Sequence, residues 1–134
     1  DVFDAEVEKD AIESRVCEQV YEYGLQDQVV VSSFEHRCLS RVRNHRNPLP
    51  VAPLLNRHAS QAEINRLVQS LRAFSCHNNH KYLGQELIRE LKERGIGLLA
   101  YTVNEEQRMQ ELAEWGITGI ITNNPAKLRE LLKQ

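Results

Sequence analysis

Three acidic residues near the start of the chain alternate with apolar residues, and this alternation gathers their side chains. Asp4, Glu6 and Glu8 occupy every second position of a strand-like run, so their carboxylates point to one face. Carboxylates that converge inside a protein repel one another unless a cation neutralises them, and such oxygen clusters suit Mg²⁺ or Ca²⁺. A solvent-exposed acidic edge strand explains the same pattern, so the residues alone leave both interpretations open.

Hydroxyl and aromatic residues end two other apolar runs. Ser32, Ser33 and Phe34 close one run, and Tyr101 closes another. If both runs are parallel strands of a barrel, Phe34 stands at the mouth where it can pack against an apolar part of a ligand, and the Tyr101 ring can form a wall of the mouth. No G-x-S-x-G surrounds Ser33, so we interpret it as the cap of the next helix rather than a nucleophile, and we expect Asn104 to cap a helix as well.

The histidines and a basic stretch give weaker signals. None of the five histidines has the spacing of a zinc protease site. His77 and His80 lie three residues apart in a polar segment that we interpret as a turn, where they either share a metal or stand in solvent. Arg41, Arg43 and Arg46 are interpreted as a solvated helix face, since no glycine-rich loop accompanies them for a phosphate.

Strand and helix patterns alternate along the whole chain. The predicted strands are residues 2–7, 29–32, 51–54, 73–76, 97–102 and 119–122. The predicted helices are residues 11–23, 35–46, 61–70, 84–94, 105–114 and 125–132. Gly24 and Gly95 supply helix stops, and Ser60 and Asn124 are plausible N-caps. Pro53 fits a strand only where no backbone donor is needed.

Six such units predict an α/β fold, a TIM-type (β/α) barrel that is incomplete, because a closed barrel has eight. We expect a single domain, residues 1–134, that forms the C-terminal three-quarters of a barrel with about six of the eight strand–helix units. The strands should lie in sequential order around an arc. An open arc exposes two strand edges, so we expect a homodimer or a complementing N-terminal fragment to cover them. Asp1 at the first position indicates a piece of a longer polypeptide.

Composition narrows the classes of partner. The net charge is −2, so no bulk electrostatic argument favours nucleic acid. No apolar run approaches the roughly 20 residues that span a bilayer, and the acidic N-terminus lacks the layout of a signal peptide. Cys17, Cys38 and Cys76 are odd in number and distant in sequence, which favours reduced thiols in a cytoplasmic protein.

Several motifs resemble one known family. Residues 98–104, LLAYTVN, and residues 119–125, GIITNNP, are similar to the closing strands of glycerophosphodiester phosphodiesterases, which read roughly W-T-V-N and G-I-I-T-D-x-P. Residues 29–34 resemble the family's I-I-S-S-F strand, and residues 4–8 resemble its N-I-E-L-K strand. The resemblance implies a TIM barrel that hydrolyses glycerophosphodiesters to an alcohol and glycerol 3-phosphate with a divalent metal, Mg²⁺ or Ca²⁺.

The resemblance also assigns residues. Glu6 matches the family's metal-binding glutamate, and Glu8 stands where the family has a lysine that meets phosphate. We take Glu8, Phe34 and Tyr101 as substrate-binding candidates, although a carboxylate at position 8 repels a phosphodiester. The H-R-G and H-D motifs that carry the family's catalytic histidines are absent, so no catalytic residue is assigned.

Three hypotheses follow. The chain is part of a glycerophosphodiester phosphodiesterase, or a non-catalytic relative that acts as a binding or assembly module, or an unrelated flavodoxin-like or partial-barrel domain. The chain by itself should have no appreciable phosphodiesterase activity, because loss of a general acid or base costs about 10²–10⁴-fold. The coding sequence upstream of Asp1 separates the first two hypotheses.

Overall fold

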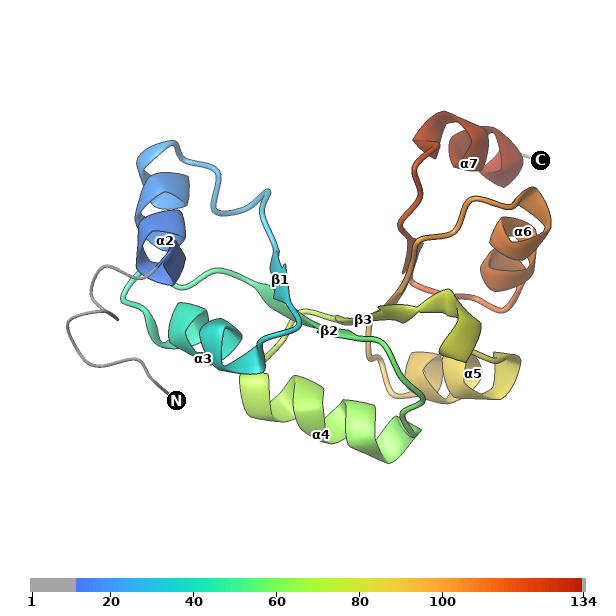
Figure 1. The fold of residues 1–134 in the computed structure, drawn as a ribbon, viewed down its shortest axis with the longest axis horizontal. Helices are drawn as coiled ribbons and strands as arrows, with labels where there is room; N and C mark the ends of the chain where they lie inside the picture. Colours follow the sequence, from blue (N-terminus) through green and yellow to red (C-terminus); the bar gives the residue numbers. More distant parts are fainter. Residues whose placement is uncertain (1–11, 134) are drawn as a thin grey trace.

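Five parallel strands form the framework of the part of the protein that the structure describes (Figure 1). The computed structural model describes residues 12–133. Its strands are β1 (Val31–Ser33), β2 (Val51–Leu55), β3 (Cys76–Asn79), β4 (Leu98–Tyr101) and β5 (Gly119–Ile120). They lie in chain order, and each neighbouring pair is parallel, so the predicted sequential arc is confirmed for these strands. The strand expected at residues 2–7 lies outside the described residues.

Helices connect the strands and lie on the outer, convex side of the curved sheet (Figure 1). They are α2 (Ile12–Glu22), α3 (His36–Asn44), α4 (Gln61–Leu71), α5 (Gln85–Glu93), α6 (Glu106–Glu114) and α7 (Pro125–Leu132), with a 3₁₀ turn, η1 (His80–Tyr82), before α5. No helix among the described residues is long and apolar enough to cross a membrane.

Helix ends follow the capping signals in several places. The Ser60 side chain accepts a hydrogen bond from the Glu63 amide at the start of α4, at 3.2 Å. Asn124 does the same for α7 through the Lys127 amide, with Pro125 in the first turn. Gly24, beyond the end of α2, has a φ of +69°, the left-handed conformation that glycine adopts readily.

One strand lies three residues away from its predicted position. The sequence predicts a strand at 73–76, but β3 runs from Cys76 to Asn79. The apolar Phe74 is 67% exposed, whereas the polar Asn78 is fully buried. Burial of Asn78 is tolerated because both ends of its side-chain amide are hydrogen-bonded. Its Nδ2 donates to the backbone carbonyl of Arg57, and its Oδ1 accepts from the backbone N–H of Asn79. Hydrophobicity alone therefore misplaced this central strand.

Pro53 sits inside β2 at a position where the sheet tolerates it. The Val51 carbonyl accepts from the Phe74 amide, so alternate residues of β2, Pro53 among them, turn their backbone groups toward β3. The pairing of β2 with β3 begins only after the proline, at Leu54 and His77. Pro53, which has no backbone N–H to donate, therefore lies just before the first paired residues of β2 and β3.

The outer face of the sheet packs against the helices as a continuous core. Its larger cluster is built from β2–β4 and from α4–α6, and its buried members are Leu55, Ile64, Cys76, Leu83, Ile88, Leu91, Leu98, Ala100, Val103, Met109 and Leu112. A smaller cluster lies under α2 and α3 and consists of Cys17, Leu39, Val42, Leu49, Val51 and Leu71. Leu67 of α4 packs against both clusters and joins them.

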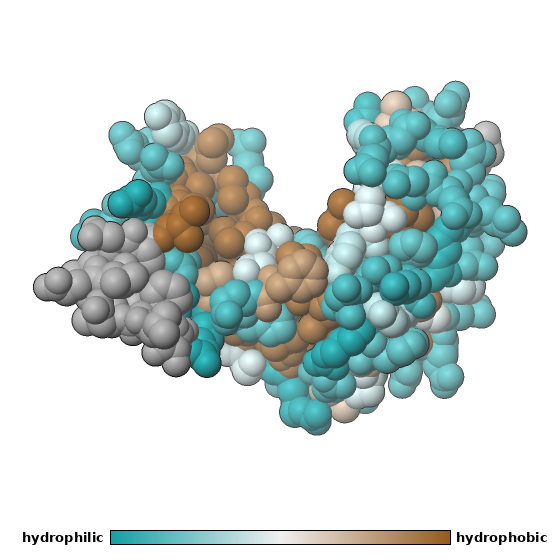
Figure 2. Space-filling model, viewed as in Figure 1, coloured by the Kyte–Doolittle hydropathy of each residue, from teal (hydrophilic) through white to brown (hydrophobic). Residues whose placement is uncertain are grey.

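The inner face of the sheet is less completely covered. Leu54, His77, Leu99 and Gly119 form one registered row across β2–β5 on the side opposite the core. Figure 2 shows a deep notch between the arm with α2 and β1 and the arm with α6 and α7, with hydrophobic residues along its wall on the α2–β1 side. Val30, just before β1, is 41% exposed. The helices therefore cover one face of the sheet, and the concave face is only partly covered.

Candidate functional site

Phe34 and Tyr101 meet at the edge of the sheet where the strands end. Phe34 directly follows β1, and Tyr101 is the last residue of β4. Their rings make an edge-to-face contact with centroids 6.3 Å apart and planes at 89°. Because β2 and β3 separate the two strands in the sheet, the contact spans the concave face. The two residues that the sequence suggested separately form one aromatic wall, and Phe34 keeps 60% of its surface exposed.

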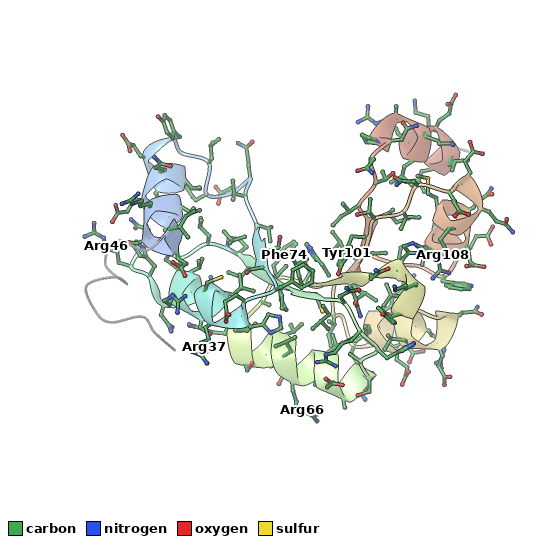
Figure 3. The ribbon with its side chains drawn as sticks, in the orientation of Figure 1. Arg37, Arg46, Arg66, Phe74, Tyr101 and Arg108 are labelled. Atoms are coloured by element: carbon green, nitrogen blue, oxygen red, sulfur yellow. The ribbon has the colours of Figure 1, made fainter. Side chains whose placement is uncertain are left out.

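The Tyr101 ring is fixed at both ends. Its hydroxyl donates to the backbone carbonyl of Leu55 at the end of β2, so the ring crosses over β3. Burial, with a smaller contribution from Tyr82, raises the pKa of Tyr101, so the hydroxyl stays protonated and can donate this hydrogen bond. Tyr101 is therefore a rigid surface rather than an ionisable group, and Figure 3 shows it near the middle of the molecule.

Asparagines lie at or just after the ends of three strands, β2, β3 and β4, at the same edge of the sheet. The Asn79 amide nitrogen donates to Asn56 Oδ1 at 3.2 Å, which links the ends of β3 and β2. Asn104 Oδ1 accepts hydrogen bonds from Thr122 Oγ1 at 3.1 Å and from the backbone N–H of Asn123 at 3.0 Å, and these bonds link the ends of β4 and β5. Sequence reasoning missed Asn56, although an amide directly after the apolar strand β2 was a visible signal, and it missed Asn79, which ends a strand of polar residues.

Two predicted caps are wrong in detail. Asn104 does not cap α6: Glu105 holds the cap position without a side-chain hydrogen bond, because the Asn104 oxygen is already bound to the loop after β5. Ser33 does not cap α3, since the cap is Glu35, whose carboxylate accepts from the Arg37 amide. The Ser33 hydroxyl instead accepts from the Glu35 amide at 2.9 Å, one step before the helix. This hydrogen bond gives the Ser33 hydroxyl a structural role in the turn before α3.

His77 lies on the inner face of β3 and is only 8% exposed, so it is a strand residue and not the solvated turn residue that we expected. Its Nε2 is 3.1 Å from the Ser75 hydroxyl, while Nδ1 is buried and has no hydrogen-bond partner among residues 12–133. Burial lowers the pKa of His77, because the charged ring loses its water. An unpaired buried nitrogen costs free energy, so this site favours an additional polar group on the concave face.

His80 belongs to η1 and is held by Arg108 of α6. Arg108 Nε donates to His80 Nδ1 at 3.2 Å, and Arg108 also donates to the backbone carbonyls of His80 and Leu83. Burial and the Arg108 charge lower the pKa of His80. The proposed metal shared by His77 and His80 is not supported, because the described residues contain no group of three or more potential metal ligands.

The basic stretch of α3 is only partly a solvated face. Arg41 forms an ion pair with Glu13 of α2 at 2.6 Å, and both side chains are largely buried. Arg43 donates to the Leu49 carbonyl at 3.2 Å. Arg46 is exposed, as expected. Two of the three arginines therefore fasten α3 to its neighbours.

The family profile of the glycerophosphoryl diester phosphodiesterases matches residues 2–127 of this chain. The chain belongs to this family. A glycerophosphodiester phosphodiesterase of Bacillus subtilis is 30% identical over 108 residues, which cover 79% of this chain and 37% of the relative.

Solved structures agree on the fold. The structure of a glycerophosphodiester phosphodiesterase from Parabacteroides distasonis matches 99% of this chain with a TM-score of 0.76 at 20% identity. The structure of an Oleispira antarctica phosphodiesterase in complex with the product sn-glycerol-3-phosphate matches 92% with a TM-score of 0.74 at 17% identity. The chain spans 54% and 51% of those two proteins. Its five described strands are an open part of a TIM-type barrel.

Family membership gives the strand ends a chemical meaning, because TIM barrels place their sites at this edge. The described residues there contribute aromatic surface, amides, hydroxyls and the exposed Lys81. Groups of these kinds are suited to binding and orienting a ligand rather than to proton transfer. The two acidic candidates, Glu6 and Glu8, lie outside the described residues, so the structure does not place them beside Phe34 and Tyr101.

Proposed function

We propose that this chain is part of a glycerophosphodiester phosphodiesterase that releases an alcohol and glycerol 3-phosphate. The observation that carries the proposal is the Phe34–Tyr101 wall at the C-terminal ends of parallel strands, in a chain that belongs to this family. In the reaction water attacks phosphorus, the P–O bond to the alcohol group breaks, and a proton from the attacking water passes to the leaving alkoxide. The aromatic wall binds the apolar part of the diester, and the neighbouring amides hold its hydroxyl groups.

The divalent cation is a separate part of the proposal. The described residues do not assemble a set of metal ligands, so we derive no step through the cation. Glu6 is the proposed ligand for Mg²⁺ or Ca²⁺, with further carboxylates supplied by the rest of the barrel. Glu8 is proposed to lie beside the substrate, where its negative charge weakens phosphate binding relative to a lysine.

The rest of the barrel is proposed to come from a complementing N-terminal fragment. The partly covered concave face and the unpaired His77 Nδ1 support additional strands that pack there and bring a polar group. A homodimer is the alternative source of such cover. Light scattering with and without Mg²⁺ distinguishes a stable monomer from an assembled form.

The second candidate function is a non-catalytic binding or assembly module. It is favoured by the chemistry of the described site, which offers hydrogen bonds and aromatic surface, whereas His77 is buried and His80 is hydrogen-bonded to Arg108.

We also propose a cytoplasmic location, which the three free thiols of Cys17, Cys38 and Cys76 support. Burial raises the pKa of the Cys76 thiol to about 12, so this thiol is unreactive at neutral pH.

A chimera tests the proposed function. The chain is assayed for release of glycerol 3-phosphate by itself, and again fused behind the N-terminal strand–helix units of the Bacillus subtilis relative. The chimera should hydrolyse glycerophosphodiesters with a divalent cation, and the chain by itself should not. In the chimera, Glu6→Gln should lower activity by at least about tenfold, as expected for loss of a metal-site group, while the nearby Asp10→Asn should not. A folded chimera that binds substrate without turnover favours the binding module instead.

A further inference from the structure

A cleft of about 340 Å³ lies outside the barrel mouth, along one side of α4. It runs beside α4 from the loop after β2, and His36 at the start of α3 forms part of its opposite side. All of its lining residues belong to two consecutive strand–helix units. The cleft is therefore complete within this chain, unlike the mouth, and does not depend on the remaining strands of the barrel.

The floor of the cleft is apolar. Leu55 and Ile64, which belong to the main core, and Ala59 and Leu67, which pack against it, line the cleft. Its volume is at the lower end of the range of about 300–1,000 Å³ for small-molecule sites. A floor of this kind accepts a short aliphatic chain, and each buried methylene group strengthens binding roughly fourfold.

The rim of the cleft is polar and carries a net positive charge. Arg57 and Arg66 line it together with a single acidic residue, Glu63, which pairs with Arg57 at 2.6 Å. Arg66 is exposed and takes part in none of the ion pairs formed among residues 12–133. Figure 3 shows Arg66 extending from α4. Its guanidinium is therefore available for an anion.

The segment of the chain that surrounds the cleft also carries a net positive charge. Residues 35–72, which contain α3 and α4, hold seven arginines, two glutamates and no lysine or aspartate, so an excess of positive charge remains after Glu13 of α2 neutralises Arg41. His36 Nε2 is 3.1 Å from the Leu54 carbonyl, which can only accept, so this nitrogen carries the hydrogen. The surroundings of the cleft thus favour an anion over a cation or a neutral group.

We propose that this cleft binds an amphiphilic anion, with its aliphatic chain on the Leu55–Ile64–Leu67 floor and its carboxylate or phosphate group at Arg66. Charge and shape are both needed. An inorganic anion lacks the chain that the floor accepts, and a neutral alcohol lacks the group that Arg66 binds. Guanidinium pairs in two-point fashion with either a carboxylate or a phosphate, so the head group is defined by its charge.

Calorimetric titration of the full chain tests the proposal with octanoate, monooctyl phosphate, octanol and inorganic phosphate. Octanoate or monooctyl phosphate should bind at least tenfold more tightly than octanol, and inorganic phosphate should not bind measurably. The stronger of the first two identifies the head group. Hexanoate should bind about 15-fold more weakly than octanoate, as expected for two fewer buried methylene groups.

Variants locate the site. Arg66→Gln should weaken octanoate binding at least fivefold and leave octanol binding unchanged. Arg129→Gln, an exposed arginine on α7, is the matched control and should bind octanoate normally. The proposal would be overturned if neither octanoate nor monooctyl phosphate bound more tightly than octanol, or if an Arg66→Gln chain bound the stronger of these two anions as well as the parent. These titrations need neither metal nor turnover, so their outcome is separate from that of the phosphodiesterase assay.

Discussion

The two faces of the sheet differ in how much of their packing this chain supplies. On the outer face, Leu98 and Ala100 of β4 lie in a core that α4, α5 and α6 close completely. On the inner face, Leu99 and Tyr101 of the same strand are only half-buried. The comparison teaches that the helices stabilise the arc of strands from outside, whereas the concave side supplies binding groups whose surroundings this chain does not complete.

The largest expected effect compares two neighbouring leucines of β4. Leu98→Ala removes a side chain that is 2% exposed, and it should lower the free energy of unfolding by about 2–5 kcal/mol. Leu99→Ala, one residue along and on the inner face, should cost less than about 1 kcal/mol because part of its surface already meets water. Urea unfolding followed by circular dichroism measures both. Equal losses would show that the inner face is covered in solution, which light scattering at two protein concentrations would then detect.

This contrast also shows what the sequence could and could not predict. The order and parallel direction of the described strands follow from apolar runs that alternate with helical patterns, and the caps at Ser60 and Asn124 follow from local hydrogen bonding. The position of β3 does not follow from hydrophobicity, because its polar residues are buried through partners distant in sequence, such as the Arg57 carbonyl.

The candidate site was less accessible to sequence reasoning. Phe34 and Tyr101 were recognised individually from their places after apolar runs. Their contact depends on the curvature of the sheet, which brings β1 and β4 together over two intervening strands. The burial of His77 was also hidden from sequence reasoning, since it lies in a run of polar residues and is nevertheless only 8% exposed.

The next effect concerns pH and the buried histidine of the inner face. Burial lowers the pKa of His77 below its usual value near 6.5, so the unfolded chain takes up a proton at a higher pH than the folded chain. The contribution of His77 to stability is therefore complete above about pH 6.5 and is lost as the pH falls toward the folded pKa, with a slope no steeper than about 1.4 kcal/mol per pH unit.

Urea unfolding between pH 7.5 and 5 measures this dependence. His77→Gln should flatten the profile in that window, and His80→Gln should flatten it in the same direction, because the pKa of His80 is also lowered. A profile that keeps its full slope in both variants would contradict the assignment of this pH dependence to the two histidines.

A smaller effect concerns the hydrogen bond that fixes the aromatic wall. Tyr101→Phe removes the hydroxyl that donates to the Leu55 carbonyl while keeping the ring, and it should destabilise the chain by about 0.5–1.5 kcal/mol. Tyr23→Phe is the matched control, since Tyr23 is 73% exposed, and it should leave stability unchanged. If both variants unfold at the parent urea concentration, the hydrogen bond does not hold the end of β4 to the end of β2.

Substitution of Phe34 should have the smallest effect on stability but a clear effect on substrate binding. Phe34→Leu keeps an apolar side chain at a position that is 60% exposed, so the free energy of unfolding should change by no more than about 0.5 kcal/mol. The substitution still removes the edge-to-face contact with Tyr101, which gives the wall its shape.

In the active chimera, Phe34→Leu should raise KM for a glycerophosphodiester with little change in kcat, because the wall binds substrate and transition state alike. Phe74→Leu, at an exposed phenylalanine that precedes β3, is the control and should alter neither constant. A drop in kcat without a change in KM would instead place Phe34 in the chemical step, and an unchanged KM and kcat would remove the aromatic wall from the substrate site.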